Sequence, residues 1–321
     1  MIPAPETALE YFISMIHYRS LDEVTLESSW VTVGVFDGVH RGHKQIIQQL
    51  TAGAHASGAP AVVLTFDPHP AILFGRSDIK ILTLPGERAN LLGSLGVDVV
   101  VTHPFDRKLA DTTASDFMHY LKDRLGVNHL MLGYDSTLGK NREGNVTRLT
   151  EIGREMGYTV ETVSAVSDES GVISSTEIRK LVTVGKVTEA TRLMGHPYML
   201  QGLVMHGDHR GRTIGFPTAN LAYAREKIVP AGGIYACWAK LGQERYKAAV
   251  NIGTNPTFTP DKQTVSVEAY LLDFDRDIYD EAIQLEFVER LRDELKFDSV
   301  DMLVKQIWDD VEQTRKTLGT A

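Results

Sequence analysis

The sequence has little that would tie a fold together covalently or hold it in a membrane. Its 321 residues include a single cysteine, Cys237, which excludes an intrachain disulfide framework and any metal site with several cysteine ligands. A chain of this kind suits a reducing compartment. No apolar run approaches the roughly 18–20 residues of a membrane span, and the N-terminus lacks the basic start and apolar stretch of a secretory signal. We therefore expect a cytoplasmic protein without a membrane partner.

The sequence also lacks an excess of positive charge. Against 42 Asp and Glu there are 33 Lys and Arg, which gives a net charge of −9 and makes a general electrostatic grip on nucleic acid unexpected. Hydrophobic residues make up 43% and charged residues 23%, ordinary values for a globular protein. At about 150 residues per domain, this length predicts two domains.

The N-terminal half alternates short apolar strands with helical patterns, after a polar lead-in over residues 1–30 with some helical character. The expected strands are residues 31–36, 61–66, 97–101, 128–133 and 158–163, with helices between them, for example over 115–125. Continuous apolar strands alternating with helices predict a parallel sheet covered on both faces. Such sheets bind ligands at the carboxyl ends of their strands, here just after Phe36, Phe66 and Gly133.

The C-terminal half, past about Gly195, has a different pattern. Residues 234–239, 246–252 and 264–272 are typical of antiparallel strands between turn residues, which indicates a small barrel or sandwich. A final helix has an apolar stripe from Val300 to Val311, and we expect this stripe to pack against the barrel. The predicted domains are residues 1–195 and 196–321.

A glycine-rich segment from Gly34 to His43 follows the first expected strand and opens a helix. Glycine permits a tight turn, and a helix N-terminus offers N–H groups and a positive dipole end to an anion. His40 and His43 are three residues apart, so both can face one pocket and stabilise charge on a transferring phosphate. The pair could instead be half of a metal site or two surface histidines, although no third ligand follows at helical spacing.

A second glycine-rich segment, from Val204 to Asn220, contains Arg210 and Arg212 and can approach phosphates closely. It ends in Thr218 and Asn220, whose oxygen atoms suit Mg²⁺ held together with a nucleotide. Judged on glycine and arginine content alone, it would be a hairpin with surface arginines.

Glu268 lies on the strand expected over residues 264–272. It alternates there with Val267 and Ala269, and we expect it to point into the barrel. A carboxylate in such a place needs a partner, commonly a cation or a substrate hydroxyl. A surface glutamate on a strand is the alternative interpretation.

Five motifs follow one another along about residues 30–315. The first glycine-rich segment has the form G-x-F-D-G-x-H-x-G-H, residues 66–70 have the form F-x-P-x-P, and residues 173–179 have the form I-S-S-T-x-I-R. Residues 204–220 end in P-T-A-N, and residues 267–274 begin with V-E. This ordered set resembles the bifunctional riboflavin kinase/FMN adenylyltransferase family, the bacterial FAD synthetases, in which the last two motifs belong to the kinase. The resemblance implies an α/β plus β fold. An N-terminal Rossmann-like adenylyltransferase domain with a parallel sheet would precede a riboflavin-kinase-like antiparallel β-barrel with a terminal helix.

The same resemblance implies roles for individual residues. Glu268 would be the base of the kinase, and His40, His43 and Arg179 would act in the adenylyl transfer. Contacts to ATP or flavin would come from Gly34, Phe36, Asp37, Gly38, Phe66, Pro68, Asp135, Ser175 and Thr176, and in the kinase from Gly207, Arg210, Gly211, Arg212, Gly215, Pro217 and Asn255. Thr218 and Asn220 would hold Mg²⁺. Riboflavin, FMN, FAD and ATP would be substrates or products, with no nucleic acid partner. The sequence does not indicate an oligomeric state.

One motif departs from the family. Relatives usually carry G-x-D-F-x-F-G, whereas residues 133–139 have Ser136 and Leu138 where aromatic residues are common beside the flavin. The alternative function is therefore a riboflavin kinase whose adenylyltransferase module is weakened or altered. A flavin-binding regulator would need neither Glu268 nor the paired histidines. An RNA-binding relative of the tRNA synthetases is at odds with the acidic charge.

Overall fold

The computed structural model describes residues 15–76, 78–169, 171–206, 214–255 and 264–319. The chain forms two compact units. Unit 1 comprises Met1–Phe36, His43–Ser77 and Pro85–Ala165, and unit 2 comprises Asp37–Gly42, Asp78–Leu84 and Val166–Ala321. Two short segments from the N-terminal half therefore belong to unit 2. The division of the sequence into domains at residue 195 remains a prediction.

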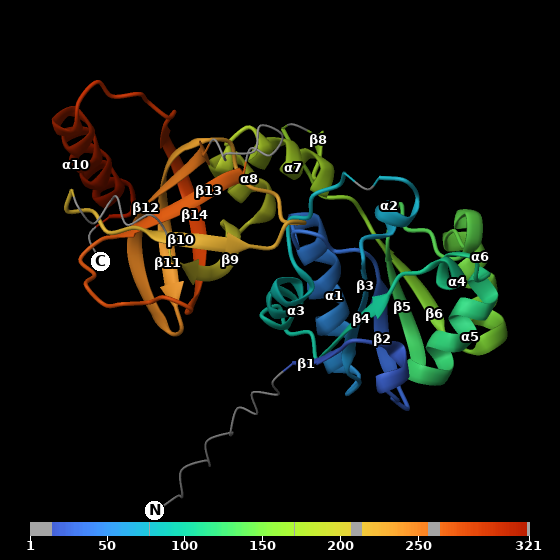
Figure 1. Ribbon diagram of the computed structural model, residues 1–321. Helices are drawn as coiled ribbons and strands as arrows, with labels where there is room; N and C mark the ends of the chain where they lie inside the picture. The colour runs from blue at the N-terminus through green and yellow to red at the C-terminus, as the bar shows by residue number, and fades with distance from the viewer. Residues whose placement is uncertain (1–14, 77, 170, 207–213, 256–263, 320–321) are drawn as a thin grey trace, which may run out of the picture. The chain divides into compact units, whose positions relative to one another are not determined.

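Unit 1 is built on a six-stranded parallel sheet, which confirms the expected α/β class (Figure 1). In sheet order the strands are β1 (Ile16–Tyr18), β4 (Val99–Pro104), β3 (Ala61–Asp67), β2 (Ser29–Val33), β5 (Val127–Gly133) and β6 (Thr159–Val163). Strand β1 corrects the expectation of a lead-in with helical character, because it pairs in parallel with β4. Only the short 3₁₀ helix η1 (Leu21–Glu23) is helical in the described part of that lead-in.

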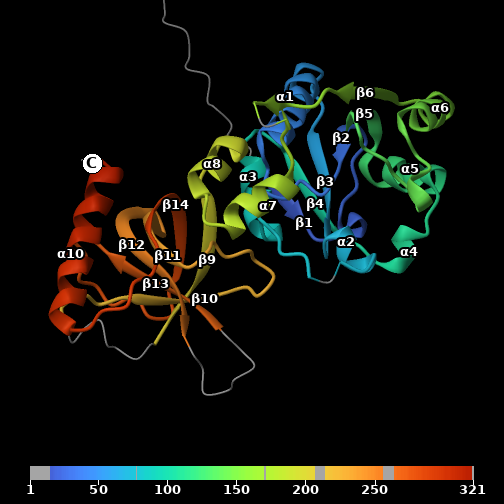
Figure 2. The same cartoon turned by 90° about the horizontal axis from the view of Figure 1, so that it is seen from above.

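Helices cover both faces of this sheet (Figures 1 and 2). Unit 1 contains α1 (Arg41–Ala56) from His43 onward, α2 (Pro70–Leu73), α3 (Pro85–Gly93), α4 (Arg107–Ala110), α5 (Ala114–Leu125), α6 (Val146–Met156) and the 3₁₀ helix η2 (Lys140–Arg142). Helix α5 illustrates the local signals. Thr113 caps its N-terminus by accepting the Asp116 N–H at 3.1 Å, and Gly126 ends it with a left-handed φ of 57°. A Cβ at Gly126 would lie 2.4 Å from the Glu27 backbone, so only glycine fits.

The strand order reverses between β2 and β5. From β2 the chain adds β3 and β4 on one side, whereas β5 and β6 lie on the other. The carboxyl ends of β2 and β5 lead into the segment from Gly34 and into Tyr134, respectively. Ligands of open parallel sheets bind at such a reversal, so this edge of unit 1 is its first candidate site.

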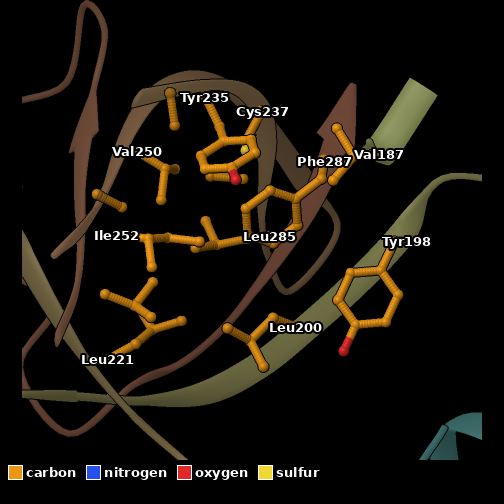
Figure 3. Close-up of a cluster of buried hydrophobic side chains, with 14 of the residues drawn as sticks. Val187, Tyr198, Leu200, Leu221, Tyr235, Cys237, Val250, Ile252, Leu285 and Phe287 are labelled. Atoms are coloured by element: carbon orange, nitrogen blue, oxygen red, sulfur yellow. The ribbon is translucent and has the colours of Figure 1, made fainter. Parts of the chain in front are cut away.

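Unit 2 contains a closed antiparallel barrel, as the sequence predicts. Its order is β10 (Ala219–Tyr223), β13 (Thr264–Leu271), β12 (Glu244–Asn255), β11 (Gly233–Leu241), β14 (Ala282–Arg292) and β9 (Tyr198–Met205). Closure removes free strand edges. Figure 3 shows side chains that fill the interior, among them Leu200, Tyr235, Cys237, Val250, Ile252, Leu285 and Phe287. Cys237 is fully buried there, as expected for a core residue, and burial raises the pKa of its thiol.

Within its described residues, unit 2 also contains three whole helices and a small two-stranded sheet. The pair β7 (Ser167–Asp168) and β8 (Gly171–Val172) precedes α7 (Ser175–Thr183) and α8 (Val187–Met194), and both helices bury apolar side chains in the barrel's core cluster. The terminal helix is α10 (Val300–Thr317), whose Val304, Ile307 and Val311 pack in a small cluster with Phe216, which precedes β10, and with Tyr270 of β13. Val300 at the start of the expected stripe remains 58% exposed. No helix in the described ranges is long and apolar enough to cross a bilayer.

Candidate functional site

A buried arginine in unit 1 donates hydrogen bonds to backbone carbonyls at the carboxyl ends of two strands. Arg88 of α3, only 3% exposed, donates from Nη1 to the Val35 carbonyl at 2.7 Å and from Nη2 to the Phe66 carbonyl at 3.2 Å. The Thr65 hydroxyl also donates to the Val35 carbonyl, at 2.9 Å. A positive charge is thus built in where β2 and β3 end. Sequence patterns did not predict this buried charge, because one arginine in a helical pattern is usually on the solvent face.

The turn after β2 has a strained backbone. Phe36, Gly38 and Val39 have φ values of 50°, 81° and 38°, all in the left-handed region. Such angles are rare for phenylalanine and for a β-branched residue, and they cluster at functional sites. Helix α1 then begins at Arg41, as expected, and places His43 in its first turn. The His43 ring lies edge-on to Phe36, with 5.1 Å between ring centroids.

An aromatic cluster lies beyond β3 and β4 in unit 1, formed by Phe66, Phe74 and Phe105. Phe66 and Phe105 meet edge to face at 5.3 Å, and Phe105 and Phe74 do so at 6.2 Å. Phe66 is 8% exposed, whereas Phe74 is 63% exposed. In the sequence, Pro68 lies between Phe66 and Phe74, and the peptide bond from Asp67 to Pro68 is cis. The sequence predicted Phe66 and Pro68 as site residues but missed Phe74 and Phe105, although Phe105 directly follows a strand end.

The segment after β5 that differs from the family motif, up to residue 139, contributes one core residue and several surface residues. Leu138 is 8% exposed and belongs to the core of unit 1, and its backbone exchanges two hydrogen bonds with Gly144. Tyr134 and Asp135 are exposed, and Ser136 is half-buried. Leucine in place of an aromatic residue at position 138 therefore changes the core of unit 1.

In unit 2, three of the predicted site residues come together. Ser174, not Ser175 or Thr176, caps α7 by accepting the Glu177 N–H at 3.3 Å. Ser175 is therefore available to donate its hydroxyl to the Asp37 carbonyl at 2.8 Å. One turn along α7, Arg179 Nη2 lies 2.6 Å from Asp37 Oδ2. Thr176 is exposed in the first turn of α7.

His40 is a buried, neutral imidazole at physiological pH. It is 6% exposed, and desolvation lowers its pKa to about 4. Asp37 opposes this shift, whereas Arg179 and His196 add to it. His40 can therefore act as a neutral N–H donor but not as a cation.

Acid should destabilise the wild-type protein partly through His40. Its pKa lies below the unfolded value of 6.5, so its contribution is complete above pH 6.5 and is lost as pH falls toward 4. Between pH 7 and 4.5 the loss is about 2 kcal/mol. Thermal denaturation of His40→Gln should show a smaller acid shift than wild type, whereas His119→Gln, at an exposed position on α5, should behave like wild type. Equal acid shifts in all three proteins would contradict the assignment.

The second candidate site starts from a row of polar residues across three barrel strands. Glu268 on β13 pairs with Asn220 on β10 and with Asn251 on β12. Directly opposed residues in an antiparallel sheet project to the same face. The neighbours Val267 and Ala269 are 1% and 0% exposed and lie in the barrel core. The expectation that Glu268 points into the barrel is therefore wrong, because its small apolar neighbours take the interior and Glu268 faces outward.

Cavity 1, of about 330 Å³, lies at the β10 and β13 side of the barrel. Its lining comes from the strands and from the segment after β13: Val204, Pro217, Thr218, Ala219, Asn220, Ala269, Leu271 and residues 274–279. The segment is organised by ring contacts, since Tyr279 stacks on His206 at 3.8 Å and Arg276 lies 5.8 Å from the Phe274 ring. The cavity thus offers aromatic and cationic groups beside Thr218 and Asn220.

Cavity 2, of about 310 Å³, lies between the outer face of the barrel and α10. Its apolar lining includes Phe216, Tyr270, Leu303 and Ile307, and its polar lining includes Thr218, Asn251, Glu268, Arg292, Glu294 and Asp310. Arg292 binds Asp310 in a fork, with Nε–Oδ1 at 2.7 Å and Nη2–Oδ2 at 2.6 Å. This ion pair joins β14 to α10. Thr218 lines both cavities, so they meet at that residue.

The remaining predicted residues of this site are partly outside the description. Gly207, Arg210, Gly211 and Arg212 lie outside the described residues, and of Asn255 only the backbone is described, as the last residue of β12. Gly215 has a left-handed φ of 88°, and Pro217 lines cavity 1. Thr218 and Asn220 line cavity 1, and a hydroxyl with an amide oxygen is a donor set that fits Mg²⁺ shared with phosphates. Within the described ranges, no three His, Cys, Asp or Glu side chains gather as a metal site.

Family models and relatives match nearly the whole chain. A model described as FAD synthetase matches residues 22–177, and one described as riboflavin kinase matches residues 194–318. A Listeria monocytogenes protein named bifunctional riboflavin kinase/FMN adenylyltransferase is 38% identical over 307 residues, covering 94% of this chain and 96% of its own. An Escherichia coli protein with that name is 36% identical over 304 residues, with the same coverage. A solved Streptococcus pneumoniae structure, described as a macrolide-efflux protein, shares the fold with a TM-score of 0.85 and 34% identity, covering 94% of this chain and 99% of its own.

Proposed function

Because this chain belongs to the bifunctional riboflavin kinase/FMN adenylyltransferase family, we propose that it makes FAD in two ATP-dependent steps. The barrel of unit 2 phosphorylates riboflavin to FMN. The motifs around His43 and Arg179 support transfer of an adenylyl group from a second ATP to FMN, with release of pyrophosphate. The single observation that supports the kinase step most strongly is the meeting of two cavities at Thr218, next to the row that carries Glu268.

In the kinase step, ATP would occupy cavity 1 and riboflavin cavity 2. Cavity 1 has Arg276 and the partly buried ring of Tyr279 for a nucleotide, whereas cavity 2 has the apolar surface that a flavin ring needs. Glu268 would accept the proton of the riboflavin 5′-hydroxyl as that oxygen attacks the γ-phosphorus. The bond from the γ-phosphorus to the bridging oxygen breaks, and ADP leaves. Positioning and electrostatics supply most of the rate in such transfers.

The residues of cavity 1 would hold Mg²⁺ with the nucleotide. Thr218 and Asn220 present hard neutral oxygens, and phosphate oxygens and water would complete the shell of the ion. When bound, the ion would neutralise charge on the phosphates.

In the adenylyl step, the FMN phosphate would attack the α-phosphorus of ATP and displace pyrophosphate, so no protein nucleophile is required. Arg179 would contribute positive charge, His40 a neutral N–H donor, and His43 a further donor at the start of α1. Each stabilises negative charge that grows on the transferring and leaving groups.

The aromatic cluster of unit 1 is our candidate for the flavin ring in this step. Phe74→Ala should raise the KM for FMN in FAD formation about tenfold, because base–aromatic stacking of this type contributes about 1–3 kcal/mol. Phe74→Tyr should keep the wild-type KM. Ile16→Ala, which removes a 49% exposed side chain from β1 of the same unit, is the control. An unchanged KM for Phe74→Ala would exclude the cluster.

The overall function is tested by incubating the protein with riboflavin, ATP and Mg²⁺ and following FMN and FAD separately by chromatography. FMN should form first and FAD later. FMN alone would support the alternative of a kinase with an inactive adenylyltransferase module, and absence of both products would contradict the function.

A further inference from the structure

Asp37 is a buried carboxylate whose oxygens are already engaged by the protein. It is 1% exposed, and the Leu82 N–H lies 3.0 Å from both oxygens. The backbone N–H and the hydroxyl of Thr83 donate to Oδ1 at 2.9 and 3.1 Å. A carboxylate without water is stable only when its oxygens accept such bonds. The side chain therefore has little capacity left for a ligand.

The remaining strong partner of this carboxylate is Arg179. Its Nη2 lies 2.6 Å from Asp37 Oδ2, a short charge-assisted bond, and the Arg179 side chain is 15% exposed. The main chain of Asp37 adds a second link, because its carbonyl accepts the Ser175 hydroxyl at 2.8 Å. One residue thus holds both a serine and the arginine of the I-S-S-T-x-I-R motif.

The backbone beside Asp37 is fixed by the same groups. The Gly38 N–H donates to Thr83 Oγ1 at 3.0 Å, so that hydroxyl links the backbone of the turn to the Asp37 carboxylate. The Gly38 carbonyl lies 3.0 Å from His196 Nε2. Asp37, Thr83, Ser175 and Arg179 form what we term the Asp37 network, and all four belong to unit 2.

We infer that Asp37 is a positioning residue for the adenylyl transfer, which holds the Arg179 guanidinium where it can meet phosphate and does not itself touch the nucleotide or flavin. This inference rests on the proposed function. It also replaces the role of direct ligand contact that the sequence motif suggested for Asp37.

The charge and the acceptor geometry both matter. In Asp37→Asn, one oxygen becomes an NH₂ donor of nearly the same size. That donor must face either the Arg179 guanidinium or the N–H groups of Leu82 and Thr83, all of which are donors. Arg179 should therefore lose its fixed position while the fold is retained.

The kinetic test is a double-mutant cycle on FAD formation from FMN and ATP. Asp37→Asn and Arg179→Gln should each lower kcat/KM about 100-fold, and the double variant should be no worse than Arg179→Gln alone. Riboflavin phosphorylation in the same proteins should stay within twofold of wild type. Multiplying effects in the double variant, or an Asp37→Asn activity within twofold of wild type, would overturn the inference.

A matched control neutralises a different carboxylate of unit 2 that also forms an ion pair with an arginine. Asp168 lies 3.0 Å from Arg192 and its side chain is 8% exposed, so Asp168→Asn makes the same chemical change outside the Asp37 network. FAD formation by Asp168→Asn should stay within twofold of wild type. A loss as large as that of Asp37→Asn would mean that the effect is a general loss of structure.

A second readout does not depend on activity. Modification of Arg179 by phenylglyoxal, followed by mass spectrometry of its peptide, should be slow in wild type and several-fold faster in Asp37→Asn. Arg107, whose side chain is 71% exposed, should react at one rate in both proteins. An unchanged Arg179 rate would overturn the positioning role. Absence of FAD from wild type, together with an accelerated Arg179 reaction in the variant, would instead refute only the proposed function.

Discussion

Glu268→Gln is expected to lower riboflavin phosphorylation about 1000-fold. Glutamine keeps the size and polarity of the side chain but cannot accept the proton of the 5′-hydroxyl, and a positioned general base typically contributes about 10²–10⁴-fold. The residue is on the outer face of the barrel, in the lining of cavity 2 and in register with Asn220 of cavity 1. Steady-state FMN formation from riboflavin and ATP measures the effect.

Two comparisons separate this loss from general damage. Glu294→Gln removes the charge of another carboxylate that lines cavity 2, and we expect it to lower FMN formation less than tenfold. Glu268→Gln supplied with FMN should form FAD at the wild-type rate. A kinase rate within threefold of wild type would remove Glu268 from the role of base.

His43→Ala is expected to lower FAD formation from FMN about 100- to 1000-fold. One positioned donor to a developing negative charge is worth roughly that factor in comparable active sites. His43 lies in the first turn of α1, after a turn with left-handed φ angles at Phe36, Gly38 and Val39. The measurement is the rate at which FAD and pyrophosphate form when FMN and ATP are the substrates.

His55→Ala is the matched control for this variant. His55 is in the last turn of the same helix, where it is half-exposed and lies 2.8 Å from Asp98. We expect FAD formation within twofold of wild type for His55→Ala, and riboflavin phosphorylation unchanged in both variants. Equal loss of both activities in His43→Ala would contradict separate sites.

The fold was largely predictable because its strands carry their own signals. Strands β2, β3, β4 and β6 are rich in β-branched residues, and β5 ends in an apolar run, so each stands out from the helices around it. Strand β1, with three residues, is too short to show a pattern and is defined by its pairing with β4. The barrel strands alternate apolar and polar residues, which predicted their existence but not their inner face.

Glu268 shows the limit of that reasoning. Alternation separates Glu268 from Val267 and Ala269 but does not say which side is the interior. The structure shows which side is the interior, because Val267 and Ala269 both lie in the barrel core. The same limit applied to the cavities, because α10 joins residues near position 300 to strands far earlier in the sequence.

Other site residues were hidden because their partners are distant in sequence. Arg88 meets Val35 and Phe66 only after α3 packs in unit 1. The sequence motif predicted that Asp37 contacts a ligand, but its carboxylate accepts hydrogen bonds from Leu82, Thr83 and Arg179. A motif identifies residues that work together, and the structure assigns which of them hold the others in place.

The central claim is that two sets of residues perform two successive steps, and product profiles of the two variants test it most directly. With riboflavin, ATP and Mg²⁺, His43→Ala should accumulate FMN without FAD, and Glu268→Gln should form neither. With FMN in place of riboflavin, Glu268→Gln should form FAD at the wild-type rate and His43→Ala should not. Either variant losing FMN formation and FMN adenylylation together would contradict the account.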